Sequence, residues 1–104
     1  PENRDHHSRN VCIFANGEVD RSPTGTGVSA RAALHFISNE LPVGTEITIE
    51  SILGTTMKVK VADETMFGKY RAVIPEVTGS ASFTGKHQFF FDPEDPLSNG
   101  FLFR

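Results

Sequence analysis

The sequence predicts an α+β domain in which a curved, mostly antiparallel sheet wraps around one central, buried helix. Three observations predict this fold class. A helical segment at residues 27–39 is apolar around most of its circumference. The segments after it alternate with the period of β-strands, and neither a linker nor an internal repeat divides the chain. Because 104 residues can bury one core, residues 1–104 are interpreted as a single domain.

Two features come before the helix. Residues 1–9 are polar and are expected to form an extended or loose segment. The short apolar run at residues 11–15 contains β-branched and aromatic side chains, which favours a buried strand, and Asn16-Gly17 then predicts a turn. Cys12 lies within this run, so it is expected to be a buried structural residue rather than a catalytic one.

The helix is predicted between Gly27 and Asn39. A Ser-Pro pair and glycines precede it, good helix formers fill it, and Asn39 together with Pro42 ends it. Between these ends only four side chains are polar, those of Ser29, Arg31, His35 and Ser38. A helix that is apolar nearly all round is normally a buried one, so the strands that follow are expected to surround it.

Three strands are predicted after the helix. Residues 46–53 alternate with period two and lead through Gly54-Thr55 into a second alternating run at residues 57–61, which predicts a β-hairpin. A third run, residues 70–77, contains Pro75, which belongs at the edge or end of a sheet because proline has no N–H for the ladder. The side chains expected on the inner face of the hairpin are Ile47, Ile49, Ile52, Met57, Val59 and Val61.

The last part of the chain is expected to add further strands at residues 80–84 and 87–91, on either side of Gly85. His87 is expected on the surface of such a strand. The Phe89-Phe90-Phe91 run is expected to lie in the core and at an interface with another part of the protein. An isolated chain that exposes these rings would self-associate, so a homodimer is among the expected assemblies.

The composition excludes several classes of function. The formal charge of −3 and the pI near 5.8 provide no basic surface for nucleic acid or an anionic membrane, and no apolar run approaches the roughly 20 residues of a membrane span. The absence of a signal-peptide stretch and the single cysteine favour the cytoplasm. No metal site is expected, because metal-ligand spacing is missing from the four histidines, His6, His7, His35 and His87.

The loop from Asp20 to Gly27 is the most informative stretch. Pro23 restricts the backbone, whereas Gly25 and Gly27 allow a ligand to approach closely. The loop runs into the predicted helix, whose first N–H groups lack partners, so it can form a cradle for a carboxylate or phosphate. The alternative is a plain turn leading into a helix. The loop has neither the third glycine of a dinucleotide-binding fingerprint nor the lysine of a P-loop.

The complete octet, Asp20-Arg21-Ser22-Pro23-Thr24-Gly25-Thr26-Gly27, is more specific than its glycines. It resembles the second active-site motif of proline racemases and hydroxyproline epimerases, Asp-Arg-Ser-Pro-Cys-Gly-Thr-Gly, with Thr24 in place of the cysteine. Other segments are similar to the strand before that motif and to the family's C-terminal signature, namely residues 10–14, 78–85, 92–96 and 100–101. The resemblance covers nearly all of the chain after residue 9.

The resemblance implies one lobe of a two-lobed fold like that of diaminopimelate epimerase, with the active site between the lobes. It also implies cofactor-independent chemistry at the α-carbon of a cyclic amino acid. The family's motif aspartate holds the ring nitrogen and its Gly-Thr backbone holds the carboxylate, so these roles fall on Asp20, Gly25 and Thr26. The alternative for Asp20 taken alone is a carboxylate that caps a loop or helix. Arg21 is expected to be a loop or lobe-contact residue rather than a catalyst.

Thr24 determines which reaction the resemblance implies. A cysteine thiol can exchange a proton at neutral pH, whereas a threonine hydroxyl cannot do so unaided. Proton removal from one face remains, and with a hydroxyl on the adjacent ring carbon it leads to loss of water. The threonine variant resembles trans-3-hydroxy-L-proline dehydratases, which form pyrroline-2-carboxylate. The alternatives are a proline racemase or hydroxyproline epimerase with an unconventional proton donor, and a non-catalytic binding module of the same fold.

The catalytic base implied by the resemblance is a cysteine of the other lobe, outside this chain. Family members are several hundred residues long, and the C-terminal signature is present in these 104 residues. The missing part is therefore expected to be an N-terminal lobe, which is the expected partner of this chain together with a cyclic amino acid. The chain alone is expected to be inactive.

Overall fold

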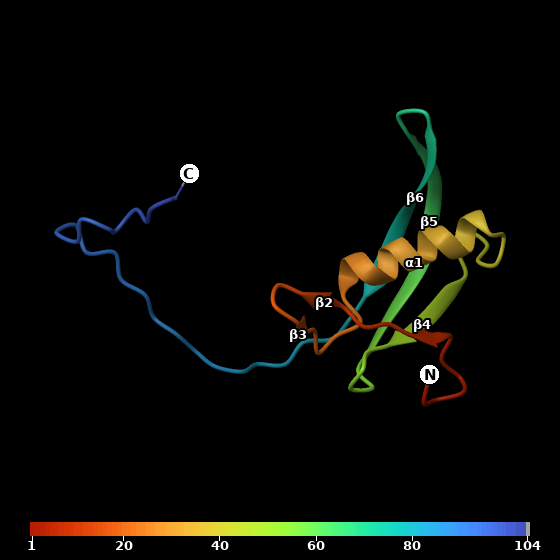
Figure 1. Ribbon diagram of the computed structural model, residues 1–104, viewed down its shortest axis with the longest axis horizontal. Helices are drawn as coiled ribbons and strands as arrows, with labels where there is room; N and C mark the ends of the chain where they lie inside the picture. The colour runs from red at the N-terminus through yellow and green to blue at the C-terminus, as the bar shows by residue number, and fades with distance from the viewer. Residues whose placement is uncertain (104) are drawn as a thin grey trace.

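A computed structural model describes residues 1–103 and shows an α+β chain with two sheets and one helix among those residues (Figure 1). The larger sheet has four strands in the order β1-β4-β5-β6, and the smaller one pairs β2 with β3. Only the β1–β4 pair is parallel, so the predicted mostly antiparallel sheet is confirmed. The elements are β1 (Ser8–Arg9), β2 (Ile13–Phe14), β3 (Glu18–Val19), α1 (Gly25–Ile37), β4 (Glu46–Glu50), β5 (Thr56–Phe67) and β6 (Tyr70–Thr78).

The β4–β5–β6 meander contains the predicted hairpin and the predicted third strand. Ile47 lies opposite Val59 in the first hairpin, and Gly54 makes its turn with a φ of 81°, a conformation that glycine adopts at little cost. β6 is an edge strand, and Pro75 pairs with Val61 where the ladder shifts register. A residue without an N–H is tolerated at an edge and at a bulge, so the prediction for Pro75 is confirmed.

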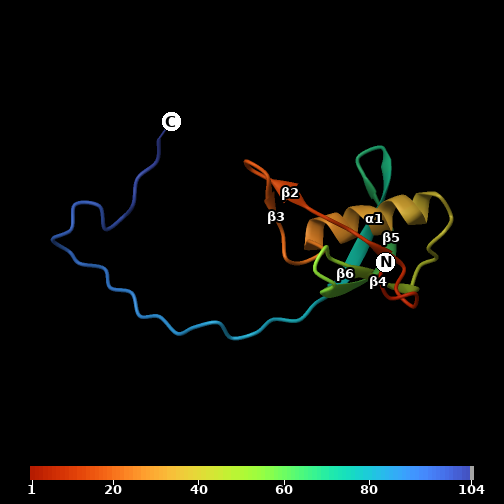
Figure 2. The ribbon, with the colours of Figure 1, turned by 60° about the horizontal axis from the view of Figure 1, so that its bottom comes forward.

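The core lies between α1 and the four-stranded sheet. α1 begins two residues before the predicted start and packs on β5 and β6, crossing the sheet as Figure 2 shows. Fully burying one valine, leucine or isoleucine side chain in such a core stabilises the folded state by about 1.5–3 kcal/mol. The buried apolar residues are Val28, Ala32, Leu41, Ile49, Val59 and Val61.

Within residues 1–103 the sheet packs on one face of α1, so these residues do not show the expected wrapping around the helix. The outer face of α1 is uncovered within residues 1–103, with 66% of Leu34 and 57% of Ile37 exposed. Ile52, expected on the inner face of the hairpin, is 47% exposed. An apolar pattern identifies side chains that can be buried, but it does not supply the second layer that buries them.

The N-terminal segment is bound to β4 through Glu50, and its last two residues form the extended strand β1. Glu50 is 2% exposed, and its carboxylate accepts hydrogen bonds from the backbone amides of Glu2 and Asn3, both 2.9 Å long. It also pairs with the His6 ring at 2.7 Å and the Arg9 guanidinium at 2.9 Å. These bonds, with those of the Asn3 and Glu2 amides the largest, lower the pKa of Glu50 from 4.5 to about 2. The segment is thereby held beside β4.

This arrangement predicts acid-sensitive stability. The carboxylate is stabilised only in the folded state, so its contribution is complete above a pH of about 4.5 and is lost as the pH falls towards about 2. In the Glu50→Gln variant, the midpoint of thermal unfolding should be lower at neutral pH and should change less between pH 4.5 and 2 than in the wild type. Equal pH slopes for the two proteins would contradict this account of Glu50.

The segment before α1 forms an exposed hairpin instead of the expected buried strand. β2 and β3 pair across Asn16-Gly17, and Gly17 has a φ of 98°, so the predicted turn is confirmed. Ile13 is 66% exposed, and Cys12 is only partly buried. The carbonyl of Cys12 accepts a 3.1 Å hydrogen bond from the amide of Asp20. The backbone of this strand therefore anchors the start of the motif loop.

Residues 79–103 form neither helix nor strand and extend away from the sheet (Figure 1). The radius of gyration is 18.8 Å, against about 13 Å for a compact domain of this length. The strands expected at residues 80–84 and 87–91 are absent, and Phe89, Phe90 and Phe91 are each more than 80% exposed rather than part of a core. A strand requires a neighbouring strand to bond with, and no strand within residues 1–103 pairs with this segment. Residues 1–103 also contain no helix with the length and apolarity needed to cross a membrane.

Candidate functional site

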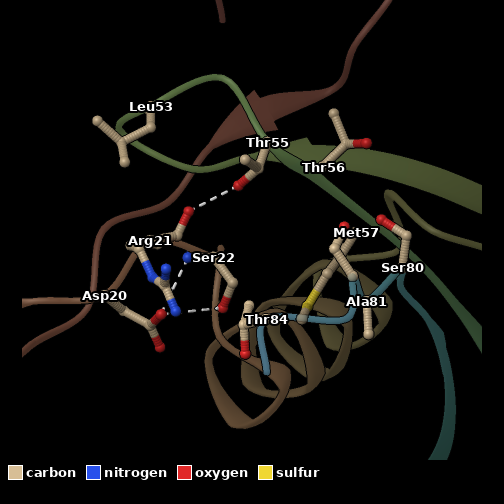
Figure 3. Close-up of a pocket in the computed structure, with 11 residues that line it drawn as sticks. Asp20, Arg21, Ser22, Leu53, Thr55, Thr56, Met57, Ser80, Ala81 and Thr84 are labelled. Atoms are coloured by element: carbon tan, nitrogen blue, oxygen red, sulfur yellow. Dashed lines mark hydrogen bonds between the residues drawn. The ribbon is translucent and has the colours of Figure 1, made fainter. Parts of the chain in front are cut away.

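The predicted site residues lie together where the motif loop meets the N-terminus of α1. Asp20 organises the loop: its Oδ1 accepts hydrogen bonds from the amide of Ser22 at 2.9 Å and from the Ser22 hydroxyl at 3.2 Å. Its Oδ2 accepts a 2.8 Å hydrogen bond from the hydroxyl of Thr24. Figure 3 shows Asp20 and Ser22 at the edge of a pocket, with Arg21 between them in sequence. The network is local, since it spans five consecutive residues.

The same network keeps Asp20 ionised. The amide of Ser22 contributes most, followed by the hydroxyl of Thr24, and together they hold the pKa of the Asp20 carboxyl below its usual value. A carboxylate has about four acceptor positions, and Oδ2 accepts only the hydroxyl of Thr24 among these bonds. Asp20 thus combines a loop-capping role, which was the alternative for it, with acceptor capacity for a cationic ligand.

Thr24 has a strained backbone. Its φ is 70° and its ψ 122°, a conformation that a β-branched residue strongly disfavours. Such an outlier costs about 1–3 kcal/mol and persists only where the surroundings enforce it, which occurs most often at functional sites. The hydroxyl of Thr24 accepts no hydrogen bond from the first turn of α1, and it donates its proton to Asp20 Oδ2. The strain therefore falls on the residue at the junction of the motif loop and α1.

The first turn of α1 presents free donors. Val28 makes the first helical hydrogen bond, to the carbonyl of Thr24, and within residues 1–103 no acceptor is bonded to the amides of Gly25, Thr26 and Gly27. A Cβ added to Gly25 would meet only open space, and the φ of Gly25 is not left-handed. Neither the conformation nor a neighbour in the described chain therefore requires glycine there, and the space above its amide is free for a ligand.

An open pocket of about 600 Å³ adjoins this loop (Figure 3). Its walls come from residues 20–22 of the motif, from the turn between β4 and β5, and from the first residues after β6. Thr55 ties two of these walls together, because its hydroxyl donates to the carbonyl of Arg21 at 2.7 Å. Ser80 and Thr84 bring hydroxyl groups to the third wall. Polar and apolar side chains both line the pocket, and its volume is large enough for an amino acid.

The other candidates lie away from this loop or have lesser roles. Arg21 is an exposed residue whose backbone is bound by Thr55, consistent with a loop residue. His87 is exposed, and its ring stacks 6.0 Å from that of Phe89. Three residues that hold the site were not identified from the sequence: Ser22, Thr55 and Asn10, the last of which donates from its side chain to the carbonyl of Pro23 at 2.7 Å. Ser22 lies inside the octet, whereas no local pattern marks Asn10 or Thr55.

This chain is similar to known proteins over nearly its whole length. The family profile described as Proline racemase matches residues 1–102. A trans-3-hydroxy-L-proline dehydratase of Colwellia psychrerythraea is 55% identical over 102 residues, which are 98% of this chain and 29% of the relative. A proline racemase of Clostridioides difficile is 48% identical over 96 residues, which are 92% of this chain and 29% of the relative.

A solved structure has the same fold. The hydroxyproline epimerase from Agrobacterium vitis, crystallised with bound trans-4-hydroxy-L-proline, is 36% identical and superposes with a TM-score of 0.74. The match covers 91% of this chain and 27% of that one. The chain spans about 30% of the length of the curated relatives it matches. With a family profile that covers nearly every residue and relatives close to half identical, this chain belongs to the proline racemase family.

Proposed function

We propose that the full-length protein is a trans-3-hydroxy-L-proline dehydratase and that this chain supplies half of its active site. The observation that carries the proposal is the hydroxyl of Thr24, which donates its proton to Asp20. The resemblance of the octet implies that Thr24 stands where the racemases have their second cysteine. A hydroxyl bound in this way is a poor proton donor to carbon, since its ordinary pKa is far above neutral. Racemisation, in which one group removes the α-proton and a second group supplies a proton to the opposite face of the ring, is therefore unsuited to this site.

Substrate binding is assigned to the loop and the helix end. Asp20, an anion with acceptor capacity on Oδ2, pairs with the secondary ammonium group of the ring. The free amides of Gly25 and Thr26 bind the carboxylate, assisted by the positive end of the α1 dipole. The same amides meet the charge that develops when the α-proton leaves, and one such donor is worth about 3–4 kcal/mol of transition-state stabilisation.

The reaction then proceeds on one face of the ring. A base from another part of the full-length protein removes the α-proton, and the electron pair moves into the carboxylate to give an enediolate. When the electron pair returns, it forms the C2–C3 double bond and breaks the bond from C3 to the hydroxyl. The departing hydroxide takes up the proton that the base removed and leaves as water, which restores the base. The resulting enamine tautomerises to pyrroline-2-carboxylate. No cofactor takes part. The family resemblance implies that the base is a cysteine.

Two alternatives make different predictions. The racemase or epimerase alternative has support from the racemases and the epimerase among the relatives, and sequence identity does not separate these reactions from dehydration. The full-length protein should be incubated with L-proline in deuterium oxide and followed by proton NMR and chiral chromatography. The dehydratase is expected to give no D-proline. Sustained α-deuteration with inversion would establish the racemase instead.

The second alternative, a non-catalytic binding module, predicts that the full-length protein releases no pyrroline-2-carboxylate from trans-3-hydroxy-L-proline.

A further inference from the structure

The strained orientation of the Pro23–Thr24 peptide is held at both ends by side chains. Its N–H, on Thr24, donates to the hydroxyl of Ser22 at 3.0 Å. Its carbonyl, on Pro23, accepts a 2.7 Å hydrogen bond from the Nδ2 of Asn10. Because the φ of Thr24 is measured from this peptide plane, fixing both ends of the peptide fixes the unfavourable value of 70°.

Asn10 is well placed to enforce this geometry, because its own backbone is anchored. Its amide donates to the carbonyl of Glu50 at 2.8 Å, next to the β1–β4 pair. The preceding carbonyl, that of Arg9, accepts a 3.0 Å hydrogen bond from the guanidinium of Arg31 on α1. The Asn10 side chain thus projects from the sheet towards a loop 13 residues further along the chain.

Gly27 provides a second, independent observation. A Cβ on Gly27 would lie 2.8 Å from the Nδ2 of Asn10, closer than real side chains approach, although its φ is not left-handed. The absence of a side chain at Gly27 therefore makes room for the Asn10 amide. This differs from Gly25, whose Cβ position is open, and it corrects the expectation that both glycines serve the approach of a ligand.

We propose that Asn10, a residue outside the motif, is a positioning residue that holds the Pro23–Thr24 peptide in its strained orientation and so sets the direction of the Thr24 hydroxyl and of the Gly25 and Thr26 amides. The inference rests on the proposed function, because those amides are assigned to the substrate. Without the Asn10 hydrogen bond, the peptide is free to rotate towards a negative φ at Thr24. The donors then no longer converge on one ligand.

The test compares Asn10→Asp with the wild type in the full-length protein. Aspartate has nearly the same shape but no donor for the Pro23 carbonyl. A displacement of about 1 Å can cost about 100-fold in rate, so kcat is expected to fall about 100-fold with a smaller change in KM. Asn16→Asp makes the same change of charge in the exposed β2–β3 turn and should leave both constants unchanged. A kcat for Asn10→Asp within twofold of the wild type would overturn the proposal.

A second comparison separates positioning from a general loss of folding. Gly27→Ala should displace the Asn10 amide and lower kcat in the wild-type background, but it should cost little more in an Asn10→Ala background, where the space is empty. Additive losses would overturn the proposal. Both comparisons use only the ratio of each variant's rate to the wild-type rate. If the wild type proves to be a racemase, the same ratios can be measured for the conversion of L- to D-proline. If it catalyses neither reaction, the proposed function fails, and the ratios are taken on the affinity for trans-3-hydroxy-L-proline.

Discussion

Asp20→Asn in the full-length protein is expected to lower kcat/KM for trans-3-hydroxy-L-proline by at least about 100-fold. The carboxylate accepts two hydrogen bonds from Ser22 and one from Thr24, and it is the group proposed to pair with the ring ammonium. An asparagine can accept on one side only, and its NH₂ group opposes either the Thr24 hydroxyl or the Ser22 donors. The substitution therefore removes the charge on the ligand side and disturbs the loop at the same time.

The matched control is Asp63→Asn, which makes the same change of charge at an exposed position of β5. Steady-state kinetics of both variants, with circular dichroism to show that each is folded, measure the effect of Asp20 itself. Asp20→Asn with kcat/KM close to that of the wild type would show that the carboxylate neither binds the ring nor orders the amides that bind the carboxylate of the substrate.

Thr24→Cys is expected to give the full-length protein proline racemase activity that the wild type lacks. A thiol ionises at an ordinary pKa near 8.5, and a position at a helix N-terminus lowers that value, so the introduced thiol could supply or remove a proton at neutral pH. A positioned acid–base group typically contributes 10²- to 10⁴-fold, so the rate of L- to D-proline conversion should rise by at least about 100-fold.

Thr24→Ser is the matched control for that gain. Serine keeps a hydroxyl that can donate to Asp20 Oδ2 but provides no group that ionises near neutral pH. It should therefore leave inversion as slow as in the wild type. Chiral chromatography of L-proline incubated with each protein measures the rate directly. Equal inversion by the serine and cysteine variants would show that the identity of this side chain does not select the reaction.

Sequence reasoning predicted the features that short-range chemistry determines. The turns at Asn16-Gly17 and Gly54, the α1 segment and the edge position of Pro75 all follow from local conformational preferences, and the structure confirms them. The octet located Asp20 and Thr24 at the start of the helix for the same reason. Each of these predictions depends on residues a few positions apart.

The features that the sequence did not reveal depend on partners far away in the chain. The bonds of Glu50 to the N-terminal segment join residues 41 to 48 positions apart, so no pattern within that polar stretch indicates them. The outer face of α1 and the expected strand at residues 87–91 have apolar patterns with nothing beside them in residues 1–103. A pattern of alternation indicates what a segment can pack against, and it carries no information on where that partner lies.

The central claim is that this family member removes water from a hydroxylated ring rather than inverting its α-carbon. The most direct measurement is the release of pyrroline-2-carboxylate from trans-3-hydroxy-L-proline, followed by NMR, with the full-length protein and with residues 1–104 alone. The account predicts that the full-length protein releases one pyrroline-2-carboxylate for each substrate molecule consumed, and that the 104-residue chain releases none. Recovery of unchanged or epimerised substrate from the full-length protein would contradict it.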